Sequence, residues 1–271
     1  MSREKYKGVC ALTGAVGPYV RCHILPQAFT RPSVVGEALY QSTRGRGEAR
    51  RWSSWYDPKL VIRKGEDILS KIDDAAIKEL RKHMLVWGGW TIFQPHFEKF
   101  GPAFPEHGYR VLSGVNTSSL IRFGLSVAWR ASVSTMADMA GVSLNSSQQT
   151  ELKKYVLGAP ITETSSFPIS LIQLSTKGMI NNQAPFTDTK QMFTEDGRVG
   201  EKVKILRIYV DGLILHVHLS SLPKERAKGS ALFLDSSDKL IVPSVTYEAS
   251  YQYENMLHLM RESHSSRIER K

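Results

Sequence analysis

Residues 10–26, CALTGAVGPYVRCHILP, combine a turn, a strand and a histidine that lies just before a proline-terminated apolar segment. The glycines and the first proline of this stretch supply the turn chemistry of a short hairpin. Pro26 prevents a strand from continuing and favours a helical turn directly after it. The stretch therefore predicts a β-hairpin that ends at His23, followed by a single turn of helix.

Two further blocks complete an ordered pattern: residues 56–66, YDPKLVIRKGE, and residues 119–134, SLIRFGLSVAWRASVS. Together the blocks resemble the bacterial HNH-like (ββα-metal) nucleases of the Ser-His-Ile-Ile-Pro type. In that family Cys-x-x-Cys, Ser-His-Ile-Ile-Pro and Leu-Leu-Cys-x-x-Cys-Glu follow one another, and a Phe-x-x-Ser-x-x-Trp-Arg-x-Ser helix comes later. The resemblance covers the first two thirds of the chain.

This resemblance implies a metal-dependent endonuclease that hydrolyses nucleic-acid phosphodiesters. In such sites a histidine deprotonates the attacking water, and one divalent cation stabilises charge on the phosphate. His23 occupies the position of the catalytic histidine. Asp57 and Glu66 match the positions of the other motif residues and would hold Mg²⁺ or Mn²⁺ through oxygen. Because a carboxylate is favourable in the first turn of a helix, Glu66 also has a purely structural interpretation.

The zinc knuckle of the family is degenerate in this chain. Its four ligand positions read Cys10, Thr13, Ile62 and Gly65, so a four-cysteine zinc site cannot form and we expect no structural zinc. Ile62 is expected to replace the metal with an apolar plug. Cys22, next to the histidine, is expected to be a buried thiol rather than a weak metal ligand.

Loss of the knuckle leaves a second function open. In this alternative interpretation, the chain is a catalytically degenerate HNH-like scaffold that binds nucleic acid or a partner protein. The sequence does not decide whether the chain is an enzyme, and it favours DNA over RNA without excluding RNA. Modules of this type occur in bacterial and phage-defence loci, so the resemblance extends to a role in anti-phage defence.

Positive charge is concentrated near the N-terminus. The chain has a net charge of +10, and residues 1–64 carry twelve lysines and arginines against four acidic residues, a net charge of +8. Such a field favours binding to a polyanion, although a solvated, solubilising surface has the same composition. The candidate nucleic-acid-binding residues are Arg21, Arg44, Arg46, Arg50, Arg51, Lys59, Arg63 and Lys64.

The loop at residues 44–51 is closed by aromatic residues at positions 52–56, which suits phosphate contact combined with base stacking. The alternative is a loop that is anchored only by tryptophans in the core.

No apolar run reaches the roughly 20 residues that cross a bilayer, and residues 1–7 lack the apolar segment of a secretory signal. We therefore expect a cytoplasmic protein with no membrane partner.

The expected fold class is α+β. An HNH-like ββα-metal module at residues 1–90 is followed by a helical extension at 91–160 and a strand-rich region with a terminal helix at 161–271. Helical periodicity predicts helices over residues 66–87, 118–139 and 147–157. Alternating apolar residues around Asp211-Gly212 predict a hairpin with a type I′ turn. A second hairpin is predicted over residues 231–242.

Several polar residues receive a structural interpretation. His216 and His218 project from one strand face and could share a metal, but an exposed polar face is the preferred prediction. Asp73 is assigned to the solvated side of the helix over 66–87. Trp129 is assigned to the core, and Arg130 to the surface of its helix.

Overall fold

The computed structural model describes residues 6–30, 39–43, 47–51, 54–161, 166–179, 181–193, 198–219, 231–234 and 239–268. At positions 39, 40, 47–51, 193, 259 and 262–268 only the backbone is described. Helices and strands are both abundant, so the α+β class is confirmed.

The helices and strands follow one another as the sequence predicted in outline. The helices are α1 (Gln27–Thr30), α2 (Arg63–Lys82), α3 (Thr117–Val133), α4 (Ser146–Val156) and α6 (Tyr251–Ile268), with 3-10 turns η1 (Trp87–Gly89) and η2 (Ala137–Met139). The strands are β1 (Lys7–Val9), β2 (Val16–His23), β3 (Leu39–Thr43), β4 (Gly47–Arg51), β5 (Tyr56–Ile62), β6 (Glu98–Lys99), β7 (His107–Ser113), β8 (Ile169–Leu174), β9 (Asn181–Gln183), β10 (Phe186–Phe193), β11 (Val199–Val210), β12 (Leu213–His218) and β13 (Lys239–Val245).

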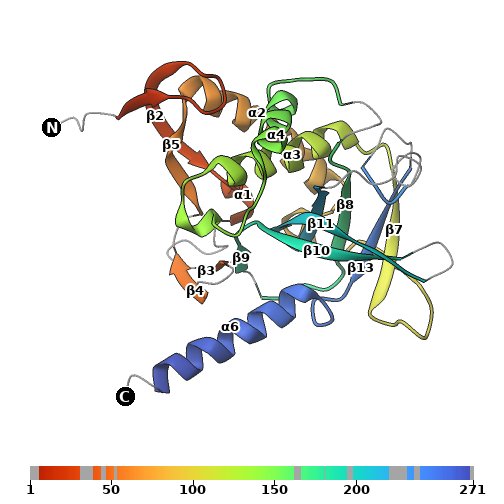
Figure 1. The fold of residues 1–271 in the computed structure, drawn as a ribbon. Coiled ribbons are helices and arrows are strands. Elements are labelled where there is room, and N and C mark those ends of the chain that lie inside the picture. Colours follow the sequence, from red (N-terminus) through yellow and green to blue (C-terminus); the bar gives the residue numbers. More distant parts are fainter. Residues whose placement is uncertain are drawn as a thin grey trace.

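The strands form three sheets (Figure 1). The first has the order β1-β2-β5, the second has the order β10-β11-β12-β8-β13-β7-β6, and the third has the order β4-β3-β9. The seven-stranded sheet is antiparallel except where β13 runs parallel to β8. The third sheet joins segments that are far apart in the chain, because β3 pairs in parallel with β9.

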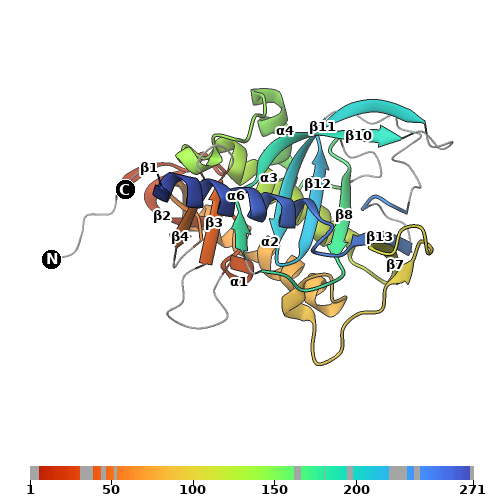
Figure 2. The ribbon, with the colours of Figure 1, turned by 90° about the horizontal axis from the view of Figure 1, so that it is seen from below.

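Helices α2, α3 and α4 lie between the first sheet and the seven-stranded sheet (Figure 1), and α6 runs along one side of the molecule past β3 and β9 (Figure 2). Helix α3 contacts α2, α4, β11 and β12. One hydrophobic cluster runs from Leu12 and Ile24 near the N-terminus through Phe123 of α3 to Leu215 of β12. The N-terminal, central and C-terminal parts of the chain therefore share a core.

Local capping and turn chemistry explain where these elements begin. The Asn116 side chain accepts a hydrogen bond from the Ser119 amide at 3.1 Å, which caps α3 as predicted. Asn145 and Gln148 form a capping box that opens α4. Asp211 and Gly212 both have positive φ, at 47° and 82°, which confirms the predicted turn between β11 and β12.

Three sequence predictions about the elements need correction. The loop predicted at residues 44–51 is, where it is described, strand β4, which pairs with β3. The hairpin predicted over residues 231–242 keeps one backbone hydrogen bond among the described residues, from the Ile241 amide to the Ala231 carbonyl at 2.7 Å; as β13, residues 239–245 pair with β7 and β8, and Phe233 forms a bridge to Ser170. Non-local partners outcompeted the local one because they complete the large sheet. The second long helix also stops at Val133, earlier than position 139, since Ser134 turns to an extended conformation with ψ 136°.

Candidate functional site

Strands β2 and β5 and helix α2 form one continuous ββα arrangement (Figure 1). The strands are antiparallel, with Cys22 opposite Asp57 and His23 opposite Tyr56, and α2 begins directly after β5. Residues that face each other across a ladder project from the same side of the sheet, and neighbours along a strand project from opposite sides. Cys22 and Asp57 therefore share one side, and His23 and Tyr56 share the other.

The four positions of the degenerate knuckle lie together at the other end of the hairpin. The Cys10 sulfur accepts a hydrogen bond from the Thr13 amide at 3.4 Å, and a Cβ at Gly65 would lie 2.9 Å from that sulfur. Ile62 is buried and packs against Gly17. Burial raises the pKa of the Cys10 thiol, but hydrogen bonds from Thr13 and the backbone of Ile62 outweigh it, so the net shift is downward. Apolar packing and one thiol thus occupy the four positions at which the family resemblance would place zinc ligands.

The candidate catalytic residue His23 ends β2 and is only partly buried. Its ring lies 6.2 Å from that of Tyr56, centroid to centroid, and the Arg21 guanidinium lies 4.8 Å above the Tyr56 ring. The backbone carbonyl of His23 accepts a 2.8 Å hydrogen bond from Nη1 of Arg130. The imidazole therefore belongs to a basic, aromatic surface, while its backbone is fixed from the interior.

Asp57, a candidate metal ligand, has both carboxylate oxygens engaged by the protein. Oδ1 accepts a hydrogen bond from the Lys59 amide at 2.8 Å, and Oδ2 accepts one from the Ser134 hydroxyl at 2.7 Å. The side chain is 3% exposed. The Lys59 contact closes an Asx-type turn in β5, and the Ser134 contact ties β5 to the end of α3. These bonds give Asp57 a structural role.

Glu66 lies in the first turn of α2 and faces inward toward Cys22. Burial raises the pKa of the Glu66 carboxyl, and a hydrogen bond with the Cys22 thiol together with the charge of Arg130 opposes the shift only in part. Burial likewise raises the pKa of Cys22 well above its usual value. The neutral Cys22 thiol donates to the His23 carbonyl at 3.9 Å and lies beside Glu66, whose Oε2 is buried with no hydrogen-bond partner among the described residues. Glu66 is therefore a half-buried carboxyl with one oxygen unpaired among the described residues.

The centre of this cluster is an ion pair between Arg130 and Asp73. The two guanidinium nitrogens of Arg130 contact the two oxygens of Asp73 at 2.9 and 2.7 Å, and Arg130 is 1% exposed. Burial alone would lower the pKa of Arg130, but the two-point contact with Asp73 raises it, so the guanidinium stays charged. A fixed cation therefore lies beside Cys22 and Glu66.

The sequence assignments of both partners are wrong. Arg130 is buried in α3 rather than on the helix surface, and Asp73 has a side chain only 13% exposed rather than solvated. A signal for Asp73 was present, because it falls within the apolar stripe of Leu69, Ile72 and Ala76 at helical spacing. A carboxylate on an apolar stripe requires a buried cation, which here is Arg130. The neighbouring residue Trp129 was predicted in the core, and its burial confirms that prediction.

As arranged, these side chains do not fit a divalent cation. Asp57 is saturated by protein donors, and Glu66 lies near the positive charge of Arg130, which would repel a metal ion. Among the residues that the structure describes, no group of three or more His, Cys, Asp or Glu side chains could hold a metal ion. The described side chains of the ββα unit therefore offer no ready set of ligands to Mg²⁺ or Mn²⁺.

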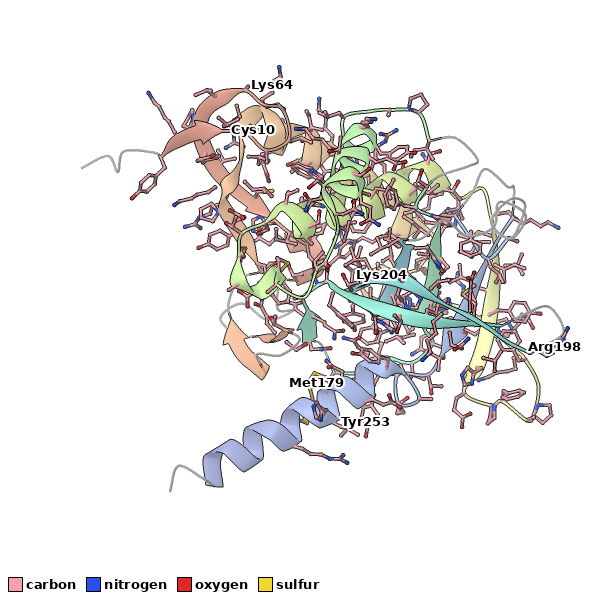
Figure 3. All side chains as sticks on the ribbon, viewed as in Figure 1. Cys10, Lys64, Met179, Arg198, Lys204 and Tyr253 are labelled. Carbon is pink, nitrogen blue, oxygen red and sulfur yellow. The ribbon has the colours of Figure 1, made fainter. Side chains whose placement is uncertain are left out.

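The candidate nucleic-acid-binding residues fall into two sets. Arg21, Lys59, Arg63 and Lys64 are exposed on β2, β5 and the start of α2, and we call these four residues the N-terminal basic surface. Lys64 points away from the molecule in Figure 3. Arg44 and Arg46 lie outside the described residues, and Arg50 and Arg51 are described only as backbone of β4.

Aromatic rings accompany this surface. Besides the Arg21–Tyr56 contact, the Lys59 ammonium lies 5.6 Å above the ring of Tyr6, which is 78% exposed. Arg63 also lies 3.9 Å from Asp67 in a solvent-exposed pair, which contributes little. Cations paired with exposed rings provide the two contacts that nucleic acids use, to phosphate and to base.

No family model, curated protein or solved structure matches the chain. In the part of the chain that the structure describes, no helix is both long and apolar enough to cross a membrane. His216 and His218 are 3% and 0% exposed, so their prediction as an exposed polar face is wrong; they lie within the seven-stranded sheet.

Proposed function

We propose that the chain is a nucleic-acid-binding protein built on an HNH-like ββα scaffold whose catalytic cation has been replaced by Arg130. The observation that carries the proposal is the fixed guanidinium of Arg130. It is paired with Asp73, holds the His23 carbonyl and lies beside Glu66 and Cys22. A protein cation in this place stabilises the ββα unit without a metal and without chemistry.

The binding surface in this proposal is the N-terminal basic surface with Tyr6 and Tyr56. Its cations project from a hairpin and the first turn of a helix, both held by the shared core. Association would be driven by release of counterions from phosphates, and the rings would stack on bases. DNA is the favoured substrate class, as the family resemblance implies.

The test is the salt dependence of binding to a labelled DNA duplex and to an RNA of equal length. Neutralising Arg21, Lys59, Arg63 and Lys64 to glutamine should reduce the slope of log affinity against log salt by up to about 3–4, since each phosphate contact contributes about 0.9. The matched control replaces exposed Lys78, Lys154, Lys202 and Lys204 by glutamine. An equal effect in the control would show that only net charge matters, and absence of any salt slope would favour a partner protein instead.

An active endonuclease remains the second candidate, and one observation favours it. His23 ends its strand with a partly exposed ring beside the basic surface, where a general base would meet a bound backbone. In this alternative the Glu66 carboxylate would have to bind a cation in place of its contact with the Cys22 thiol. Cation-dependent cleavage that is lost in His23→Ala would separate the two candidates.

A further inference from the structure

A second cluster of basic residues lies on the seven-stranded sheet, on the face opposite α3. Leu206, Leu215 and Val217 belong to the core beneath α3, so their neighbours along β11 and β12 face the other way. On that opposite face Arg207 lies across from His216, and His216 lies across from Ser170 of β8. His218 follows two residues along the same strand.

The two imidazoles are buried with almost no hydrogen-bond partners. Among the residues that the structure describes, both ring nitrogens of His216 and Nδ1 of His218 have none, and Nε2 of His218 lies 3.4 Å from the Ser170 hydroxyl. The ring of Phe233 packs edge-on against His218, with centroids 5.3 Å apart. Each unpaired buried group costs about 1–3 kcal/mol, and a bound ion is one of the ways in which a native structure offsets that cost.

The surroundings of the imidazoles are positively charged. Lys190 of β10 is partly buried and forms no ion pair with any residue of the described chain. Arg207 lies 3.7 Å from Asp188 and 4.3 Å above the ring of Tyr251. In the part of the chain that the structure describes, two cations thus lie near one carboxylate, that of Asp188. Burial lowers the pKa of His216 and of His218, the latter to about 4, so at neutral pH both rings are uncharged and each carries one N–H donor.

We propose that this face binds a phosphate-type oxyanion, held by Lys190, His216 and His218 with the Ser170 hydroxyl as a further donor. An oxyanion with several acceptor oxygens matches a set of donors that have no acceptor of their own. A metal ion bound by the two imidazoles would be repelled by Lys190 and Arg207. Because β10 is an edge strand and Lys190 is partly exposed, the anion would enter beside Lys190. The proposal is independent of the nucleic-acid-binding function.

The experiment titrates the full chain with inorganic phosphate and follows the histidine ring signals by NMR together with the midpoint of thermal unfolding. Phosphate should shift the His216 and His218 signals and raise the midpoint. Lys190→Met should weaken phosphate binding by about tenfold or more, the effect of one charge-assisted hydrogen bond. Lys204→Met is the matched control, because Lys204 carries the same charge on the opposite face of the same strand pair. It should bind within a factor of about two of the parent.

Three results would overturn the proposal: unchanged His216 and His218 signals at millimolar phosphate, an equal loss of affinity in both lysine variants, or tight Zn²⁺ binding that Lys190→Met strengthens. His216→Gln and His218→Gln, checked for native unfolding cooperativity, should each weaken phosphate binding. Titration with adenosine monophosphate distinguishes the source of the anion. Tighter binding than inorganic phosphate indicates a phosphate monoester, and weaker binding indicates free phosphate; both support an oxyanion site.

Discussion

Two buried polar clusters of this protein differ in how their charges are matched. In the ββα unit, Arg130 meets both oxygens of Asp73 and the carbonyl of His23, and Asp57 is held by Lys59 and Ser134. On the seven-stranded sheet, His216 has no hydrogen-bond partner and Lys190 has no ion pair within the described chain. Apart from Oε2 of Glu66, the first cluster is matched by partners within the described chain, and the second is not.

Partners within the protein separate structural side chains from candidate binding side chains. Asp57, at a position that resembles a nuclease site, has partners on both oxygens, whereas Glu66 keeps one buried oxygen without a partner. The two histidines of β12, outside the blocks that resemble the family, have the larger number of unmatched ring nitrogens among the described residues. Buried polar groups with partners stabilise a fold, whereas unmatched groups indicate a ligand.

The largest expected effect comes from breaking the matched cluster. Asp73→Ala leaves the Arg130 guanidinium buried without its counter-ion, so we expect the free energy of unfolding to fall by about 3–5 kcal/mol. Urea titration followed by circular dichroism measures this loss. Asp74→Ala, at the exposed neighbouring position, is the control and should change stability by less than about 0.5 kcal/mol. Equal small losses in both variants would contradict the matched-cluster interpretation.

An intermediate effect is expected from the unmatched cluster as pH falls. The pKa of His218 is about 4 in the folded protein and near 6.5 when the chain unfolds, so the unfolded state binds more protons between these values. The neutral His218 ring therefore makes its full contribution to the free energy of unfolding above pH 6.5. That free energy falls by about 2–3 kcal/mol as the pH is lowered toward 4. Lys190, Arg207 and Asp188 face this group, as do Ser170 and Phe233.

Denaturant midpoints between pH 7 and 4 measure this dependence. The double variant His216→Gln, His218→Gln should show a shallower decline, and His96→Gln, at a side chain 83% exposed, should follow the parent. A parallel decline in all three proteins would assign the acid sensitivity to other groups.

The smallest effect concerns Asp211, whose carboxylate accepts a hydrogen bond from the Gly88 amide at 2.8 Å. Burial raises the pKa of Asp211 to about 6, against the opposing effect of Gly88. Its charge therefore destabilises the fold progressively from pH 3.8 to 6 and fully above pH 6. Asp211→Asn keeps the acceptor oxygen and suits the positive φ of the turn, so stability should rise by about 1–2 kcal/mol at pH 7.

The gain in Asp211→Asn should vanish below pH 4, where the parent carboxyl is protonated. Thermal unfolding at pH 7 and pH 4 measures both values. The exposed Asp67→Asn variant is the control and should change neither. A gain that is equal at the two pH values would mean that turn geometry, not charge, is responsible.

Much of the fold could be predicted because its signals are local. Asn116, the Asp211-Gly212 turn and the apolar stripe of α2 each act through neighbours within a few residues. The pairing of β13 with β7 and β8, and of β3 with β9, could not be predicted, because those partners are distant in the chain. Non-local pairing depends on the whole core rather than on any single segment.

The candidate site was predictable in position but not in chemistry. Sequence spacing brought Cys22, Asp57 and Glu66 to one ββα unit, and the structure places Cys22 opposite Asp57 and in contact with Glu66. The Arg130–Asp73 pair was missed because it joins two helices whose mutual packing no spacing reveals. The burial of His216 and His218 was missed because apolar residues alternate with them along the strand. That alternation predicts one buried face and one exposed face, whereas both faces of β12 are buried.

One assay distinguishes the proposed binding of nucleic acid without cleavage from nuclease activity. Supercoiled plasmid, linear DNA and structured RNA are incubated with the parent chain and with His23→Ala, in Mg²⁺, Mn²⁺ or EDTA, and both mobility shift and product length are read. We expect a salt-sensitive shift by both proteins and uncut substrate in every condition. Cation-dependent cleavage by the parent that disappears in His23→Ala would rule out a binding protein without activity and establish the nuclease.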